Sequence, residues 1–270
     1  MIAKVFAQEA REHGRTLLIK WAFGYGLSAL FLAGSFLPVP LISALTKGAV
    51  FGALIALPLV VIVIMTAAYW RSMYGERGYF THSLPVRGRD LFWGKALFML
   101  AATSATALLT ALAGAGALLT VRAQQMGVER ALENAREALH VVGPRGALLA
   151  VVITLAWLFA NSVAIPAMLN VGAQARWNAW GFAVPAALLV AYYLVNQILL
   201  LAVTFLVPIG VNTTTGELTY TWMLEDVVAN LAHGSPVSQV GLAGIVTVPL
   251  LALGAAAWAV RVISTRTSLR

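Results

Sequence analysis

The sequence predicts an all-α polytopic membrane protein with six transmembrane helices and a polar cytoplasmic loop between the second and third of them. Of its 270 residues, 60% are hydrophobic and only 10% are charged, and the mean hydropathy is +0.85. A soluble domain carries about 25% charged residues. The apolar residues also fall into long runs separated by polar segments. The chain has room for six runs of roughly 20 residues, the length that crosses a bilayer.

The N-terminal segment, residues 1–16, alternates charged and apolar residues. Its apolar stripe consists of Ile2, Val5 and Phe6, which predicts an amphipathic helix lying on the membrane surface. A frayed cytosolic tail is the alternative. The segment lacks the small-residue cleavage site that follows the apolar core of a secretory signal peptide.

Six apolar runs follow, and we interpret each as a membrane span. They cover residues 17–37, 49–70, 96–121, 147–169, 180–207 and 239–260. Pro38 and Pro40 end the first span and Pro208 ends the fifth, because proline interrupts a helix. The third span is rich in Ala, Gly, Ser and Thr, as is typical of membrane helices that pack closely.

Two longer polar segments, 122–145 and 211–238, are expected on the extracytoplasmic side. Residues 125–140 combine good helix formers with alternating charges, which predicts a solvated helix that ends at Gly143-Pro144. Residues 211–238 contain no Lys or Arg and carry an apolar patch around Trp222. We expect one or two short helices there, lying at the membrane face or dipping into it.

The distribution of basic residues predicts the orientation. With six spans, 13 of the 18 Lys and Arg residues fall on the side that holds both termini, and 5 fall on the other. Cytoplasmic loops carry the excess of positive charge, so both termini are expected in the cytoplasm and the protein in the cell membrane. The same rule, together with anionic lipid headgroups, accounts for the net charge of +8 without a nucleic-acid partner.

Composition and motifs exclude several chemistries. The chain has no cysteine, which rules out disulfides and cysteine-based zinc sites. The four histidines have no metal-ligand spacing; they are His13, His82, His140 and His233. An intramembrane protease is disfavoured, because Ser162 has no histidine in a facing span and no HExxH motif is present.

The segment 88–96, GRDLFWGKA, resembles a phosphate-binding loop but departs from it at two positions. Five residues instead of four separate Gly88 from Gly94, and Ala96 stands where the motif needs a Ser or Thr for magnesium. We therefore expect no nucleotide site in this chain.

All ten Asp and Glu residues lie outside the predicted spans. A coupling ion must bind at depth, so this distribution disfavours a proton- or sodium-coupled carrier, although backbone carbonyls can form a sodium site. Four uncharged polar residues do lie inside spans: Asn161, Ser162, Asn196 and Gln197. They are expected either to make interhelical hydrogen bonds or to line a substrate path.

The polar segment 71–95, called here the basic loop, carries the sequence on which a family resemblance rests. It contains YGERGYFTHSLPVR at 74–87 and DLFWGK at 90–95. This pattern resembles the first cytoplasmic loop of ABC exporter permeases of the antibiotic, lantibiotic and bacitracin export group, which are distant relatives of the ABCG exporters. Residues 125–140 are longer than that family leads us to expect.

The resemblance implies a permease subunit without catalytic activity of its own. It would pair with a second permease copy or a paralogue and with two soluble ABC ATPase subunits, which hold ATP and magnesium, while this chain holds no cofactor. The cargo would be an amphipathic or hydrophobic peptide, lipid or drug. The residues implied in ATPase coupling are Tyr74, Glu76, Arg77, Gly78, Leu84, Pro85 and Arg87. A gradient-driven carrier and a non-transport membrane protein are the alternatives.

Overall fold

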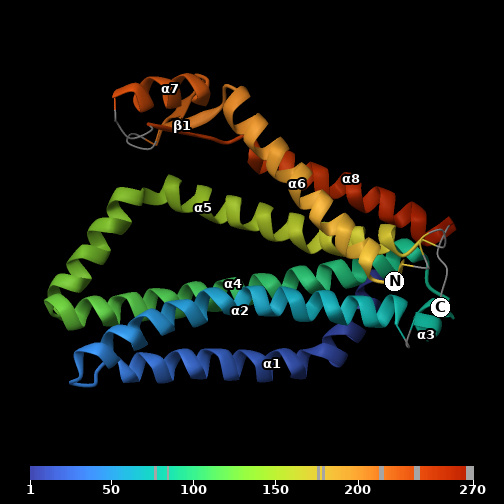
Figure 1. Ribbon diagram of the computed structural model, residues 1–270, viewed down its shortest axis with the longest axis horizontal. Coiled ribbons are helices and arrows are strands. Elements are labelled where there is room, and N and C mark those ends of the chain that lie inside the picture. Colours follow the sequence, from blue (N-terminus) through green and yellow to red (C-terminus); the bar gives the residue numbers. More distant parts are fainter. Residues whose placement is uncertain are drawn as a thin grey trace. The chain divides into compact units, whose positions relative to one another are not determined.

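The computed structural model describes residues 1–75, 78–83, 85–174, 177, 180–212, 216–233 and 238–265. The long helices are α1 (Ile2–Gly34), α2 (Pro40–Tyr74), α4 (Gly88–Met126), α5 (Val128–Gly172), α6 (Ala183–Leu206) and α8 (Gly244–Thr265) (Figure 1). These six are long and apolar enough to cross a membrane, so the predicted polytopic helical class is confirmed. Two short helices, α3 (Gly78–Ser83) and α7 (Met223–His233), lie between them in the chain.

The chain forms two compact units. The first contains Met1–Val86 and Asp90–Gly143, and the second contains Arg87–Arg89 and Pro144–Arg270. The basic loop therefore contributes residues to both units.

In the first unit, the predicted surface segment and first span form one continuous helix. Helix α1 has 33 residues, or about 50 Å of helix, which exceeds the roughly 30 Å of a hydrocarbon core. The helix changes direction towards its N-terminal end (Figure 1). Its residues 2–13 include a face that is buried at Val5 and Glu9.

Helices α1, α2 and α4 pack through apolar contacts and a few hydrogen bonds. Val50, Leu54 and Ala117 form one buried cluster, on which Tyr25 and Phe31 pack. The Tyr25 hydroxyl also donates to the Thr106 carbonyl oxygen at 3.1 Å, and the Trp21 Nε1–H donates to the Thr106 hydroxyl at 3.0 Å. These bonds pair α1 with α4 over their middle turns.

Residues 128–142 are helical, which confirms most of the helix predicted at 125–140, but residues 125 and 126 belong to the end of α4 and Gly127 separates them from it. Gly127 and Gly143 flank this stretch with φ of 88° and 60°, values that favour glycine because other residues meet steric strain there. Gly143 interrupts the helical geometry inside α5 at the predicted position.

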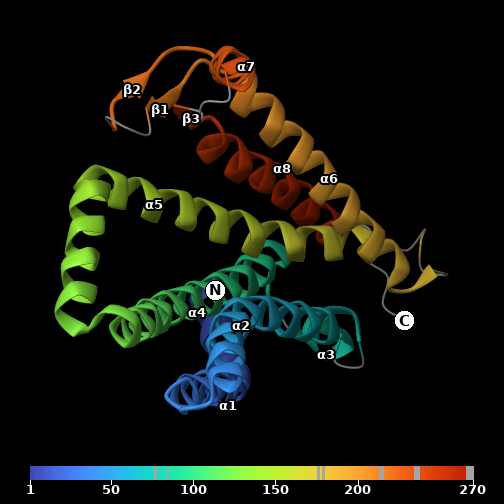
Figure 2. The ribbon, with the colours of Figure 1, turned by 60° about the vertical axis from the view of Figure 1, so that its left-hand side comes forward.

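In the second unit, the segment after α6 differs from the prediction of one or two short helices. Helix α7 is present, but a small antiparallel sheet accompanies it, in the order β2 (Leu218–Thr219), β1 (Gly210–Asn212), β3 (Gln239–Gly241) (Figure 2). Strands of two or three residues are too short to show the alternating pattern by which a strand is detected in a sequence.

Polar side chains hold this small fold together. The buried Gln239 Oε1 accepts hydrogen bonds from the hydroxyls of Thr219 and Thr221, at 3.0 and 2.8 Å. The Asp226 carboxylate joins α7 to the start of β3, because it accepts bonds from the Ser238 hydroxyl at 2.6 Å and the Ser238 N–H at 2.9 Å.

Candidate functional site

The basic loop is built from the end of α2, the short helix α3 and the start of α4. Tyr74 is the last residue of α2 and its ring lies 5.1 Å from that of Trp70. Gly78 is buried and begins α3, whereas Pro85 and Arg87 are exposed. The other predicted coupling residues, Glu76, Arg77 and Leu84, lie outside the described residues.

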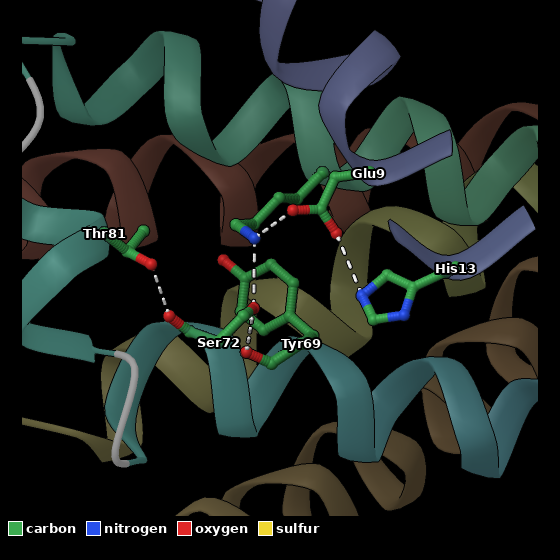
Figure 3. Close-up of polar contacts among 6 residues, drawn as sticks. Glu9, His13, Tyr69, Ser72 and Thr81 are labelled. Atoms are coloured by element: carbon green, nitrogen blue, oxygen red, sulfur yellow. Dashed lines mark hydrogen bonds and ion pairs between the residues drawn. The ribbon is translucent and has the colours of Figure 1, made fainter. Parts of the chain in front are cut away.

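A buried polar network anchors this loop to the N-terminal helix (Figure 3). The Lys95 ammonium, near the start of α4, donates to the Glu9 carboxylate of α1 and to the Ser72 hydroxyl of α2, the latter at 3.0 Å. The Thr81 hydroxyl of α3 in turn donates to the Ser72 carbonyl oxygen at 2.7 Å. One connected set of hydrogen bonds thus joins four helices.

Glu9 and Lys95 form an ion pair that is largely withdrawn from solvent. Their side chains are only 10% and 4% exposed. Removing two charges from water is costly, and their mutual attraction offsets this only when both are well hydrogen-bonded. His13 Nε2 lies 3.6 Å from the second Glu9 carboxylate oxygen, one turn further along α1. Removing either side chain would therefore leave the other charge buried without its partner.

Close packing reinforces the network. Gly94 of α4 lies directly against α1, where an added Cβ would stand 2.6 Å from Val5 Cβ and 3.1 Å from the Ile2 carbonyl oxygen. The rings of Phe6 and Phe98 meet edge to face at 5.8 Å between their centres. The N-terminal turns of α1 are thus fixed on α4 by both apolar and polar contacts.

A groove opens between the N-terminal turns and the basic loop, with a volume of about 530 Å³. Lys4, Gln8 and Glu12 line it from α1, at the spacing of one helix face. Thr81 and Pro85 line it from the loop. The groove is mixed in charge, since the Glu9–Lys95 pair also lines it.

Gly88 belongs to the second unit, together with Arg87 and Arg89. A Cβ at this position would lie 2.6 Å from the Ile263 Cγ2 of α8. Gly88 therefore packs against α8, within that unit, without space for a side chain.

Two of the four predicted path residues come together. Asn161 of α5 and Asn196 of α6 line one cavity of about 170 Å³. Ser162 is buried and does not line it, and the Gln197 Nε2–H group donates to the Tyr193 hydroxyl at 2.9 Å. The Gln197 bond lies within α6 and is therefore not the interhelical bond expected as the alternative, while Asn161 and Asn196 border an open space.

The sequence interpretation missed Glu9 and Lys95 as partners. A signal for Glu9 was present, because it continues the helix face of Ile2 and Val5 at spacings of three and four residues. A carboxylate on an apolar face needs a buried partner. Among the residues that the structure describes, no group of three or more His, Cys, Asp or Glu side chains is arranged to hold a metal ion.

No protein-family model, curated protein or solved structure matches this chain. The resemblance of the basic loop to ABC exporter permeases accordingly stays a prediction.

Proposed function

We propose that this chain is the membrane-spanning permease subunit of an ATP-driven exporter and that its basic loop is the docking surface for a soluble ABC ATPase. The six apolar helices make it an integral membrane protein. The energy for transport would come from ATP hydrolysis on the partner, and a second permease copy or a paralogue would complete the transporter.

The observation that supports the proposal best is the polar network of Glu9, Ser72, Thr81 and Lys95. A loop that only connects two spans needs no buried charge. Here a buried ion pair attaches the loop to α1, and two further hydrogen bonds join the parts of the loop that belong to α2, α3 and α4. Such an attachment suits a loop that must move as one body with its helices when a partner pushes on it.

The basic loop has residues in both compact units. Thr81 ties α3 to α2 in the first unit, and Gly88 packs on Ile263 of α8 in the second. Residues of the loop thus pack on the helices of their own unit in each case. Interfaces packed this closely shift as rigid bodies between discrete arrangements instead of deforming gradually.

The distribution of charge gives the proposed orientation. If the side with 13 of the 18 basic residues is cytoplasmic, the basic loop and both termini would face the ATPase in the cytoplasm. The segment 128–142 and the small α7–sheet fold would then lie on the outer side.

Co-purification tests this function. The full chain is tagged and expressed with the soluble ABC ATPase subunit that we expect to be encoded beside its gene, and the complex is extracted in mild detergent. We expect the ATPase to accompany the wild-type chain. Glu76→Ala and Leu84→Ala should reduce its recovery or uncouple its ATP hydrolysis from transport, because both residues belong to the predicted docking segment.

Arg136→Ala is the matched control, since it removes a charge from the opposite polar segment and should leave recovery unchanged. Recovery of the chain without any ATPase, or equal losses in the loop variants and in Arg136→Ala, would contradict the proposal.

A further inference from the structure

A cavity between α5 and α6 lies about two helical turns from the point where these helices touch. At that point Gly172 faces Pro185 so closely that a Cβ on the glycine would lie 2.6 Å from the Pro185 Cα. The cavity-lining residues Ile165 and Tyr192 each stand seven positions further into their helix, or about 10 Å along it.

The lining combines a small polar set with an apolar one. Asn161 comes from α5, and Tyr192, Tyr193 and Asn196 come from one face of α6. The remaining lining residues are apolar: Ala164, Ile165 and Leu189. No charged residue is among those that line the cavity.

Part of this polar set lacks a partner within the chain. The Tyr192 hydroxyl is buried and makes no hydrogen bond among the residues described. The Asn161 Nδ2 donates to the Trp157 carbonyl oxygen at 2.9 Å, which uses one of the two N–H groups of that amide. Unsatisfied polar groups at membrane depth are costly, so a partner from outside the chain is expected at this position.

We infer that this cavity binds an uncharged amide group of an amphipathic, peptide-like substrate; the inference rests on the proposed exporter function. An asparagine side chain presents an N–H donor and a carbonyl acceptor, the same pair of groups that an amide presents in return. The apolar part of the lining accepts an aliphatic side chain. A carboxylate or an ammonium group would find no opposite charge here and would lose its hydration.

The size and depth of the cavity agree with this ligand class. At about 170 Å³ it holds one group of a substrate, since pockets that enclose a whole drug-sized molecule measure about 300–1,000 Å³. Asn196 stands 13 residues after Ala183, the first residue of α6, or about 20 Å along a helix of 24 residues. The site therefore lies near the middle of the span, where an amphipathic molecule would be carried.

The test measures binding of N-acetyl-leucyl-leucinamide to the purified full chain in lipid nanodiscs, without any ATPase, by saturation-transfer NMR. N-acetyl-leucyl-leucine, which ends in a carboxylate, and its methyl ester, which lacks the terminal N–H groups, are the comparison ligands. We expect saturable binding of the amide, and binding of the carboxylate at least about tenfold weaker, because the carboxylate loses its hydration without gaining a partner.

Two variants locate the binding. Tyr192→Phe removes only the unpartnered hydroxyl oxygen, and Asn196→Leu removes a lining carboxamide at similar volume. Each should weaken amide binding about fivefold, the value of one neutral hydrogen bond. Asn134→Leu removes an exposed carboxamide from the segment 128–142, outside the cavity, and should leave binding unchanged.

A signal no larger than that of empty nanodiscs, or equal affinity in wild type, Tyr192→Phe and Asn196→Leu, would overturn the inference. The two proposals fail separately. If the chain binds the amide but recruits no ATPase, the inference about the cavity holds and the proposed exporter function fails. If the chain recruits the ATPase but does not bind the amide, only the inference about the cavity fails.

Discussion

The two polar sites of this protein differ in charge. At the basic loop, the Lys95 ammonium contacts the Glu9 carboxylate and the Ser72 hydroxyl, and these three residues also line the groove beside the loop. Between α5 and α6, the side chains of Asn161 and Asn196 are neutral and border an open space, beside a tyrosine hydroxyl that has no partner in the described chain.

This difference indicates different tasks. Buried charges that are fully paired hold helices in one arrangement, since any other arrangement would separate the charges. Neutral polar groups around an open cavity keep hydrogen-bonding capacity for a ligand that binds and dissociates. We therefore expect substitutions at the first site to affect stability and coupling, and substitutions at the second to affect ligand binding with little change in stability.

Lys95→Met should have the largest effect, because it leaves the Glu9 carboxylate buried without its partner. A loss of about 3–5 kcal/mol in the free energy of unfolding is expected for breaking a buried pair. Unfolding of the full chain in detergent, followed by circular dichroism against temperature or denaturant, measures it.

The double variant Glu9→Met with Lys95→Met is the control for that substitution. Replacing both charges by apolar groups of similar volume should recover most of the loss. If the double variant is as unstable as Lys95→Met alone, the ion pair is not the reason for the effect.

Gly94→Ala should have the next largest effect, since the new methyl group collides with Val5 and with the Ile2 carbonyl oxygen. Overpacking of this kind costs about 1–3 kcal/mol. Gly114→Ala in the same helix has no atom within 4 Å of the new Cβ and should be neutral or stabilising. Equal stability of the two variants would show that α1 does not pack on α4 as described.

Two tyrosine variants compare a paired with an unpaired hydroxyl. Tyr25→Phe removes a group that bonds the Thr106 carbonyl oxygen and lies 3.0 Å from the Thr110 hydroxyl, and should cost about 1 kcal/mol. Tyr192→Phe removes a hydroxyl with no hydrogen bond in the described chain and should leave stability unchanged or slightly raised. A larger loss of unfolding free energy in Tyr192→Phe than in Tyr25→Phe would contradict this assignment of the paired and the unpaired hydroxyl.

The smallest effect concerns Asp226 in the outer fold. The Ser238 hydroxyl, with the backbone N–H groups of Ser238 and Gln239, holds the pKa of Asp226 below its ordinary value of 3.8. The stabilisation is therefore complete above that ordinary value and is lost as the pH falls through the lowered pKa. In the wild type, hydrogen exchange of the β3 amides should therefore accelerate as the pH falls through the lowered pKa of Asp226. In Asp226→Asn, which has no carboxylate to protonate, exchange of the β3 amides should show no such acceleration.

The six spans could be predicted from the sequence because a bilayer demands long apolar runs, and residue order alone displays these. The break in the helix at Gly143 could also be predicted, because the Gly143-Pro144 pair that causes it is local in the sequence. The Glu9–Lys95 pair joins residues 86 positions apart in the chain, and a single sequence does not show which distant residues meet. The small sheet was missed because its strands have only two or three residues.

The candidate site was predictable in part. The charge of the basic loop and its glycine and proline content distinguish it in the sequence. The polar network that anchors the loop is not visible there. The spans contain four uncharged polar candidates, and only Asn161 and Asn196 share a cavity. Whether a polar residue lines a cavity depends on which face of its helix meets another helix. An apolar membrane span has little periodicity in its sequence, so the sequence does not indicate that face.

The most direct test of the account is photo-crosslinking from the basic loop in living cells. Benzoylphenylalanine is placed at Tyr79 of α3, which is 57% exposed, or at Leu139 in the segment 128–142, which is 72% exposed. The account predicts a crosslink to the soluble ATPase subunit from position 79 and none from position 139. A crosslink to the ATPase from position 139, or none from either position while both chains are present, would contradict it.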